Sequence, residues 1–488
     1  MLDGMAIPTL SIVASPEDST ADITVHGVVK GESGPEAQGF STEFLEKLGA
    51  RGDRDQVSRT VIDDSIVLFV GLGRRADRES LRAAAAVALR AAGDVPALAL
   101  ALPVADDADA RAVLEGAALG AYEYRRADAE GSGFANEVQV AVGDAHVSDT
   151  AVRQSRIIAE AVHRSRDLGN MPPNILTPAE FADRVVAETA EDPVTVTVMD
   201  EQQLREGGFG GLIGVGQGSQ NPPRMVVIDY NPSGASRHLA IVGKGITFDT
   251  GGISLKPASA MLGMKLDMSG AGTAYAAVLA AARLGIPVRI TAYLCLAENM
   301  PSHTAVKPED VITIRGGKTV EVTNTDAEGR LVMADGLQYA LEQNPDAIID
   351  IATLTGAQEI ALGKRYAGVM GNHEDLVDEF LDAVAAADER AWAMPLPEEL
   401  GEMLESPVAD IANARPGKRE AGMLVAGVFL REFVVLPNDE EIPWVHVDIA
   451  GPAGNDGKPH GWTSKGATGV MVRSLIDFAE RFGRFSDQ

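Results

Sequence analysis

The chain has 488 residues, of which 45% are hydrophobic and 23% are charged. This balance is typical of a globular protein, and the length predicts two or three domains with a sizeable buried core. The formal net charge of -29 opposes binding to phosphate backbones and anionic membranes, although it leaves room for a local basic patch. We therefore expect neither a membrane nor a nucleic acid as a partner.

Signals for export or membrane insertion are missing from the sequence pattern. The short apolar run Ala6–Ala14 has no basic residue before it, so it lacks the order of a secretory signal. No later stretch reaches the roughly 18 to 20 uninterrupted apolar residues that a bilayer span requires. The single cysteine, Cys295, lies in an apolar run and cannot form an internal disulfide. We expect a soluble, cytoplasmic protein in which Cys295 is a buried core residue.

The first 150 residues alternate apolar runs with helical patterns. The run Ser65–Val70 precedes an alanine-rich helical pattern over Ser80–Ala92, and the run Ala97–Val104 precedes another over Asp109–Tyr122. This alternation predicts a small N-terminal α/β domain over residues 1–150.

A charged helical pattern over Val152–Leu168 runs into Pro172 and Pro173, which stop it. We therefore expect a linking helix over residues 151–173, between the N-terminal domain and a larger domain over residues 174–488.

The larger domain alternates more strongly than the first. Runs that are apolar throughout and separated by helices predict a central, mostly parallel sheet covered by helices on both faces. The expected strands are Met225–Tyr230, Leu239–Val242, Val288–Leu296, Ala347–Ile351 and Val445–Ile449. The expected helices are Gly270–Leu284, Leu331–Gln343, Asp375–Ala386 and Gly466–Phe482. The fold class is thus α/β in both domains, and functional groups should collect in loops at the strand ends.

Two segments of the larger domain carry more ionisable residues than their apolar surroundings should tolerate. These residues are Lys244, Asp249, Lys256 and Asp267 in the first segment, and Asp326, Glu328 and Arg330 in the second. Buried carboxylates need cations or hydrogen-bond donors, because an unpaired buried charge is costly. Divalent ions such as Mn²⁺, Mg²⁺ or Zn²⁺ would balance the acidic excess, and two such ions activate a shared water for amide hydrolysis.

The alternative interpretation is structural. A lysine ligand is unusual, because its pKa near 10.4 must fall below the working pH, at a cost of roughly 4 to 5 kcal/mol at pH 7. A buried salt-bridge network would explain the same residues without any metal. Its members would be Lys244, Asp249, Asp267 and Glu328. Spacing alone does not decide between the network and a metal site.

The run Asn324–Val332 resembles the signature of the leucyl aminopeptidase family, the cytosol aminopeptidases. The spacing Lys244-x4-Asp249-x6-Lys256-x10-Asp267 is similar to the family's other ligand segment. The resemblance extends from Arg166 to the end of the sequence and covers the first 150 residues only loosely. It implies a catalytic metallopeptidase domain, peptide substrates and a homohexamer.

The same resemblance implies two divalent metal ions per subunit, Mn²⁺ or Zn²⁺, and a water that they activate. Lys244, Asp249, Asp267 and Glu328 would hold one ion, and Asp249, Asp326 and Glu328 would hold the other. Lys256 would stabilise the oxyanion, and Arg330 would hold a bicarbonate ion as general base. The pocket for the first side chain would be formed by Met264, Asn324, Thr353, Leu354, Gly356 and Ala450.

The implied function is a metal-dependent aminopeptidase that releases N-terminal residues, preferably leucine or other apolar residues, from peptides. A DNA-binding or scaffolding member of the same family is the first alternative, and the net charge of -29 argues against it. The second alternative is a carboxylate-bridged two-metal enzyme that acts on another substrate, such as a dipeptide or cysteinyl-glycine.

Overall fold

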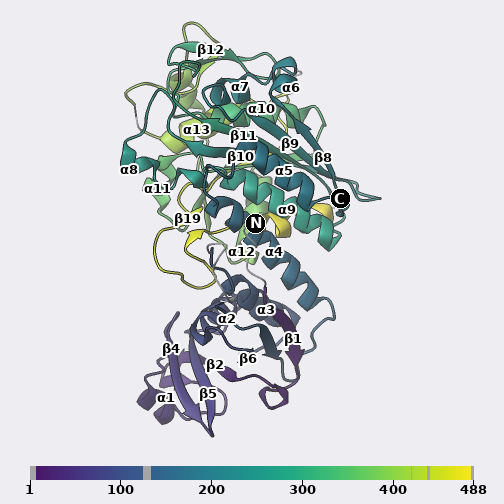
Figure 1. The fold of residues 1–488 in the computed structure, drawn as a ribbon, viewed down its shortest axis with the longest axis vertical. Coiled ribbons are helices and arrows are strands. Elements are labelled where there is room, and N and C mark those ends of the chain that lie inside the picture. The colour runs from purple at the N-terminus through teal and green to yellow at the C-terminus, as the bar shows by residue number, and fades with distance from the viewer. Residues whose placement is uncertain (1–6, 125–132, 419, 437–439, 485–488) are drawn as a thin grey trace. The chain divides into compact units, whose positions relative to one another are not determined.

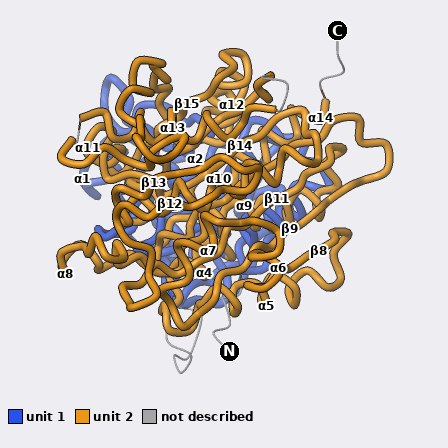
Figure 2. The backbone as a smooth tube through the Cα atoms, turned by 90° about the horizontal axis from the view of Figure 1, so that it is seen from above, with its two compact units in different colours: residues 1–163, 455–466 blue, residues 164–454, 467–488 orange. Residues whose placement is uncertain are grey.

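The structure is a computed structural model that describes residues 7–124, 133–418, 420–436 and 440–484. It divides into two compact units (Figure 2): Met1–His163 with Asn455–Gly466 as unit 1, and Arg164–Gly454 with Ala467–Gln488 as unit 2. The division falls within helix α4 (Ala151–Asn170). Among the described helices, none combines the length and the apolar character that crossing a membrane would require.

Unit 1 is built on a seven-stranded sheet with the order β1-β7-β6-β2-β5-β4, in which β3 also pairs with β2 (Figure 1). Its strands are β1 (Thr9–Val13), β2 (Ile23–Gly31), β3 (Gly34–Glu36), β4 (Val57–Ile62), β5 (Ser65–Gly73), β6 (Ala97–Ala101) and β7 (Glu137–Ala141). The five parallel strands are β1, β7, β6, β2 and β5, and β4 pairs antiparallel with β5. The predicted α/β character of the first domain is confirmed.

Helices α2 (Arg78–Ala92) and α3 (Asp107–Gly120) pack closely against each other in unit 1, and α1 (Thr42–Leu48) is shorter. Asp77 begins α2 by accepting a hydrogen bond from the Ser80 amide, and Asp106 caps α3 in the same way. A Cβ atom at Gly116 would lie 2.1 Å from the Arg82 carbonyl oxygen, so only glycine allows this approach of the two helices.

Unit 2 is built on an eight-stranded sheet with the order β16-β15-β18-β14-β10-β11-β9-β8. Its strands are β8 (Thr195–Met199), β9 (Arg224–Tyr230), β10 (His238–Asp249), β11 (Arg289–Asn299), β14 (Ala347–Ala352), β15 (Ala367–Gly371), β16 (Ala391–Ala393) and β18 (Trp444–Asp448). The central strands β18, β14, β10 and β11 are parallel, whereas β9 and β8 pair antiparallel. The mostly parallel sheet expected from the sequence is therefore present.

Helices α9 (Ser269–Leu284) and α10 (Gly329–Leu341) cover opposite faces of this sheet (Figure 1). A Cβ atom at Gly243 would lie 2.7 Å from the Ala271 Cα atom of α9, whereas the neighbouring Val242 lies against Gly336 of α10. Because successive strand residues face opposite sides, the two helices must lie on different faces. The other helices of the unit are α5 (Pro178–Glu188), α6 (Glu201–Glu206), α7 (Gly210–Gly216), α8 (Ala258–Met261), α11 (Gly356–Leu362), α12 (Glu374–Ala386), α13 (Gly422–Arg431) and α14 (Val472–Arg484).

The last helix begins later than the sequence pattern predicted. We expected it to start at Gly466, but Gly466–Ala467 forms strand β20, which pairs with β19 (Gly454–Asn455). Gly466, Gly469 and Met471 have φ angles of 84°, 68° and 66°. A helix cannot pass through these left-handed residues, so α14 starts at Val472.

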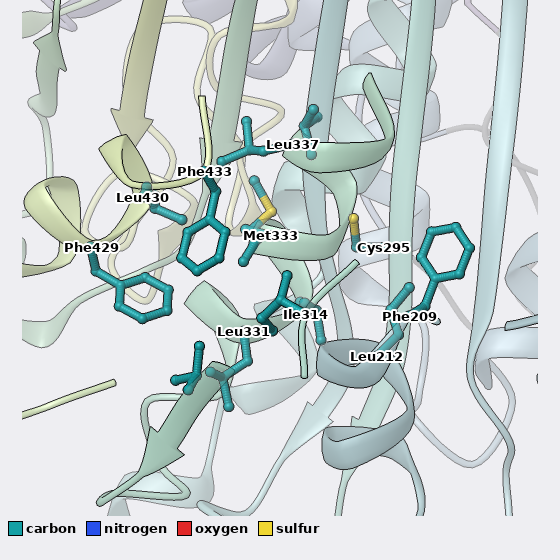
Figure 3. Packing of buried hydrophobic residues seen from close by; sticks show 14 of the residues in the cluster. Phe209, Leu212, Cys295, Ile314, Leu331, Met333, Leu337, Phe429, Leu430 and Phe433 are labelled. Atoms are coloured by element: carbon teal, nitrogen blue, oxygen red, sulfur yellow. The ribbon is translucent and has the colours of Figure 1, made fainter. Parts of the chain in front are cut away.

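A large core cluster lies between α10, α13 and the sheet (Figure 3). Leu331, Met333 and Leu337 of α10 pack there with Phe429 and Phe433. Cys295 of β11 is a buried free thiol in the same cluster, as the sequence predicted. This packing fixes α10, whose first residues belong to the ionisable cluster described next.

A small sheet of three strands, β12 (Asp310–Thr313), β13 (Thr319–Val322) and β17 (Ile411–Ala412), lies in the same unit. Strands β12 and β13 are antiparallel, and β13 and β17 are parallel. The loop that follows β13 leads directly into α10.

Candidate metal centre

The ionisable residues of the two sequence segments meet beside strand ends and helix starts of unit 2. Strand β10 carries Lys244 and ends at Asp249, and the loop that follows carries Lys256. Asp267 lies two residues before α9, and Glu328 lies directly before α10. Because α9 and α10 cover opposite faces of the sheet, their N-terminal ends bring side chains to the end of strand β10 from both sides.

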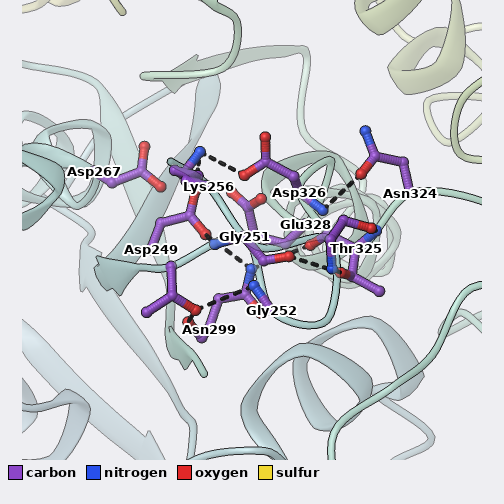
Figure 4. Close-up of polar contacts among 12 residues, drawn as sticks. Asp249, Gly251, Gly252, Lys256, Asp267, Asn299, Asn324, Thr325, Asp326 and Glu328 are labelled. Carbon is purple, nitrogen blue, oxygen red and sulfur yellow. Dashed lines mark hydrogen bonds and ion pairs between the residues drawn. The ribbon is translucent and has the colours of Figure 1, made fainter. Parts of the chain in front are cut away.

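Lys256 bridges two carboxylates in this cluster (Figure 4). Its Nζ atom lies 2.7 Å from Asp249 Oδ2 and 2.5 Å from Asp326 Oδ1. Asp249, Asp326 and Glu328 each offer one carboxylate oxygen, and these three oxygens lie within 4.8 Å of one another. The three acids thus converge on a space that one cation could fill.

Lys244 makes the second set of contacts. Its Nζ atom lies 2.8 Å from Asp267 Oδ1 and 2.9 Å from Glu328 Oε1, and it donates to the carbonyl oxygen of Thr353 at 2.9 Å. The Lys244 side chain is buried, and so are both carboxylates. Strand β10 therefore places a buried ammonium group between the two helix starts.

Burial shifts the pKa values of these groups. Burial, the largest cause, raises the pKa of Asp267 and of Glu328, and repulsion from Asp249 adds to the rise. Burial acts against the charge of Lys244, but attraction by Asp267, Glu328 and Asp249 outweighs it and raises the Lys244 pKa. Burial lowers the pKa of Arg330 to about 10, so its guanidinium remains charged at neutral pH.

Two carboxylate oxygens in the described part of the chain show that the cluster is incompletely satisfied. Asp267 Oδ2 and Glu328 Oε2 are buried and have no hydrogen-bond partner. A buried oxygen of this kind is costly unless a donor or a cation takes it. The salt bridges of Lys244 use the other oxygen of each carboxylate, so they leave these two atoms available. Four carboxylates beside two ammonium groups therefore fit a divalent metal site.

Two of the six residues expected to line the pocket, Asn324 and Thr353, contact the acidic cluster. Met264, Asn324, Thr353, Leu354 and Ala450 are partly buried, and Gly356 is exposed at the start of α11. Thr353 Oγ1 donates to Asp267 Oδ1 at 2.8 Å, and Asn324 Oδ1 accepts from the Asp326 amide at 3.0 Å. These two residues are therefore tied directly to the acidic cluster.

Asp448 was not assigned a role from the sequence, although its strand was expected. Its buried carboxylate accepts hydrogen bonds from the amides of Leu354 and Ala450, both at 3.1 Å, and from Thr355 Oγ1 at 2.7 Å. Asp448 thus joins two of the expected pocket residues, which follow the neighbouring strands β14 and β18. The pattern Asp448-x-Ala450 alone carries no signal for such a contact.

Asn299 and Thr325 were also missed. Asn299 Nδ2 donates to Asp249 Oδ1 at 2.8 Å and to the carbonyl oxygen of Thr325 at 3.1 Å. Thr325 Oγ1 donates to the Gly251 carbonyl oxygen at 2.6 Å and accepts from the Ser254 amide at 2.7 Å. These bonds connect the two ionisable segments. An asparagine at the end of an apolar strand, as at position 299, is the one sequence feature that hints at this role.

Comparison with known protein families decides the assignment. A sequence model described as the cytosol aminopeptidase family, catalytic domain, matches residues 163–476. The chain belongs to the cytosol aminopeptidase family. A model of the family's N-terminal domain matches residues 32–129 as well.

Curated relatives agree with this assignment over nearly the whole chain. A protein of Clavibacter michiganensis named "Probable cytosol aminopeptidase" is 52% identical, with 98% of this chain and 100% of the relative covered. A protein of the same name from Leifsonia xyli is 50% identical, with 98% and 99% covered. The family resemblance inferred from the sequence motifs is confirmed.

A solved structure has the same fold. The bottromycin maturation enzyme BotP, in complex with Mn, is 36% identical to this chain and aligns with a TM-score of 0.86. The alignment covers 95% of this chain and 100% of the BotP chain. Membership of the family makes the chain a metal-dependent aminopeptidase, a hydrolase that acts on peptides. The acidic cluster fits that chemistry.

Proposed function

We propose that the chain is a leucyl aminopeptidase that releases leucine and other apolar residues from peptide amino termini through a two-metal site. The convergence of Asp249, Asp326 and Glu328, whose oxygens lie within 4.8 Å of one another, carries this proposal. The catalytic domain would be residues 174–488, behind the linking helix of residues 151–173. Residues 1–150 would form the N-terminal domain.

Five residues would hold two divalent ions, Mn²⁺ or Zn²⁺. Lys244, Asp249, Asp267 and Glu328 would hold one ion, and Asp249, Asp326 and Glu328 the other. The free oxygens of Asp267 and Glu328 support this division, because both face no donor in the described structure. When bound, two such ions lower the pKa of a shared water and polarise the scissile carbonyl. Lys244 would have to lose its proton, which only a strong local cation makes affordable.

Lys256 is suited to stabilise a developing oxyanion. Burial disfavours its charge, but Asp249 and Glu328 outweigh this effect and raise its pKa, so the ammonium group persists at neutral pH. Its bonds to Asp249 and Asp326 hold the charge in one place before the reaction. A fixed charge of this kind needs no reorganisation as negative charge builds on the carbonyl oxygen.

Arg330 would hold a bicarbonate ion that accepts the proton of the attacking water. Its guanidinium is buried and charged, and its Nη1 atom donates to the carbonyl oxygen of Asn413 at 2.7 Å. A planar guanidinium with one edge bonded in this way can offer its remaining donors to a planar anion.

The proposed pocket would favour leucine. Leu354, Ala450 and Met264 give it apolar walls, and apolar pockets favour apolar side chains. A Cβ atom at Gly356 would meet nothing within 4 Å, so open space adjoins the start of α11. This opening would admit a branched side chain such as that of leucine.

Hydrolysis of leucyl p-nitroanilide in the presence of Mn²⁺ tests the proposal. We expect Lys256→Met and Asp326→Asn to lower kcat by about 10²- to 10³-fold, as loss of an electrostatic stabiliser does elsewhere. The control is Lys307→Met, which removes a lysine that is 66% exposed. Undiminished activity in both site variants would refute the assigned roles. Glycyl and glutamyl p-nitroanilides, and a panel of dipeptides that includes cysteinyl-glycine, test the preference for leucine.

We propose in addition that the chain forms a homohexamer, as the family resemblance implied. Closed symmetric assemblies of identical chains are common among soluble proteins. Mass measurement of the purified protein tests this, because a single chain of 51.2 kDa in solution would contradict it. Metal analysis of the active protein should find about two ions per chain, and a content near zero would defeat the two-ion site.

A further inference from the structure

The loop that carries half of the candidate site is held by a neighbouring strand. Strand β13 runs parallel to β17, with Val320 opposite Ile411 and Glu321 opposite Ala412. Both strands therefore end at the same edge of the small sheet. Residues 323–328 follow β13, and Asn413 follows β17, with its amide bonded to the Glu321 carbonyl oxygen at 2.9 Å.

The side-chain amide of Asn413 bonds to the backbone of this loop at both of its ends. Its Oδ1 atom accepts from the amides of Thr323 at 2.8 Å and Asn324 at 3.2 Å. Its Nδ2 atom donates to the carbonyl oxygens of Asn324 at 2.7 Å and Ala327 at 3.3 Å. Asn413 is fully buried, so water does not compete for these bonds. One amide thus bonds to the main chain on both sides of Asp326.

The main chain of Asn413 adds a contact with Arg330. The carbonyl oxygen of Asn413 accepts from Arg330 Nη1 at 2.7 Å, and both groups are buried. The residue therefore touches the chain before Asp326, the chain after it, and the guanidinium at the start of α10. These groups belong to three different parts of the proposed site: the pocket wall, the ligand loop and the anion-binding residue.

We propose that Asn413 is the positioning residue that holds the loop of residues 323–330 in the geometry required for metal binding and catalysis. The proposal rests on the assigned roles of Asp326, Glu328 and Arg330. Outer contacts that orient ligands typically change metal affinity or activity by about 10- to 100-fold when they are removed. A misplacement of about 1 Å can cost about 100-fold in rate.

The chemistry of the position requires an amide. Asn413 must accept from two N–H groups at Oδ1 and donate to two carbonyl oxygens at Nδ2. Aspartate has the same shape but no donor, so one of its oxygens would face the carbonyl oxygens of Asn324 and Ala327. Asn413→Asp therefore reverses half of the contacts while it keeps the volume of the side chain.

A matched control exists in the same unit. Asn372 Oδ1 accepts from the Trp444 amide at 2.8 Å, and its Nδ2 atom donates to the Ile442 carbonyl oxygen at 2.9 Å. Asn372→Asp makes the same substitution at a partly buried amide whose Nδ2 atom also donates to Glu441 Oε2 at 3.1 Å. It therefore measures the cost of placing a carboxylate against oxygen acceptors outside the candidate site.

Calorimetric titration of the chelator-treated full-length chain with Mn²⁺ gives the first readout, and kcat and KM for leucyl p-nitroanilide give the second. For Asn413→Asp we expect Mn²⁺ affinity to fall by about 10- to 100-fold, and kcat by about 100-fold with a smaller change in KM. Asn372→Asp should stay within about threefold of the unchanged protein in both. If Asn413→Asp does not fold, Asn413→Ser, which introduces no buried charge, should show the same loss of affinity.

Mn²⁺ affinity within about threefold of the unchanged protein in the folded Asn413 variant would overturn the proposal. So would a loss of activity that only follows the loss of folded protein, with an equal loss in Asn372→Asp. The metal titration needs no peptide, so it tests Asn413 even if the chain releases no leucine. Failure of the unchanged protein on leucyl substrates would instead refute the proposed function.

Discussion

Replacing Gly329 by alanine is expected to displace Lys244 from the candidate metal centre. Gly329 is the first residue of α10, and a Cβ atom there would lie 2.5 Å from Lys244 Cε, 2.7 Å from Nζ and 2.9 Å from Cδ. Favourable contacts between such atoms need about 3.5 to 4.0 Å, so the end of the lysine must retreat by about 1 Å.

That retreat would weaken the three contacts that Lys244 Nζ makes with Asp267, Glu328 and Thr353, at 2.8, 2.9 and 2.9 Å. A displacement of about 1 Å at a reacting centre can lower the rate by about 100-fold. The free energy of unfolding should change little. Overpacking costs about 1 to 3 kcal/mol, and the preference of helices for alanine over glycine, up to about 1 kcal/mol, offsets part of that cost. The expected signature of Gly329→Ala is therefore a large loss of activity with a melting temperature shifted by only a few degrees.

The assay is kcat/KM for leucyl p-nitroanilide at saturating Mn²⁺, together with thermal unfolding of the same samples. Gly401→Ala is the control, because a Cβ atom at Gly401 would meet nothing within 4 Å. It should leave both quantities unchanged. If Gly329→Ala keeps more than about a third of the original kcat/KM, Lys244 does not depend on that contact and the reasoning from its position is wrong.

Further outcomes follow from the same contacts. Burial raises the pKa values of Asp267 and Glu328, so these carboxyl groups keep their protons to higher pH, and a metal ion that binds must displace those protons. Mn²⁺ affinity should therefore rise with pH, and calorimetry should detect the release of protons. A pH-independent affinity would contradict this. Chelation should lower the melting temperature, since an ion present at 100 times its Kd stabilises the fold by about 2.7 kcal/mol, and an unchanged melting temperature would argue against a bound metal. Asp448→Asn keeps only one acceptor oxygen for the three donors on Leu354, Ala450 and Thr355. We therefore expect KM for leucyl substrates to rise severalfold, with a smaller change in kcat. A fall in kcat alone would mean that Asp448 acts in the chemical step and not in the pocket. Leu337→Ala, in the core under α10, should lower the free energy of unfolding in urea by about 2 to 5 kcal/mol, and a loss below about 1 kcal/mol would mean that the cluster collapses around the gap.

The central sheet and the acidic cluster could be predicted from the sequence, because both have a recognisable local pattern of residues. The strands around Val242 and Ile349 are apolar on both faces, and the spacing from Lys244 to Asp267 is distinctive. The start of α14 was misjudged, because the left-handed backbone at Gly469 and Met471 is not visible in an otherwise helical composition.

Other features could not be predicted because they join residues that are far apart in the chain. Asn413 contacts Asn324 across 89 positions, and Asp448 contacts Leu354 across 94. Neither residue type is unusual at its place, so only the pairing of strands reveals the contact. The grouping of Asn455–Gly466 with the N-terminal unit is of the same kind, since Arg90 bonds to the Gly461 carbonyl oxygen across 371 positions.

The helices α9 and α10 begin beside Asp267 and Glu328, and the consequence is electrostatic. The start of a helix carries a partial positive charge, which stabilises a nearby carboxylate by about 0.3 to 1 kcal/mol. Because the two helices approach the sheet from opposite faces, their positive ends act on the acidic cluster from two directions. Part of the mutual repulsion of the carboxylates is thus offset by the backbone itself. We therefore expect the chain to fold before it acquires its metal, and a chelated sample to remain folded at room temperature.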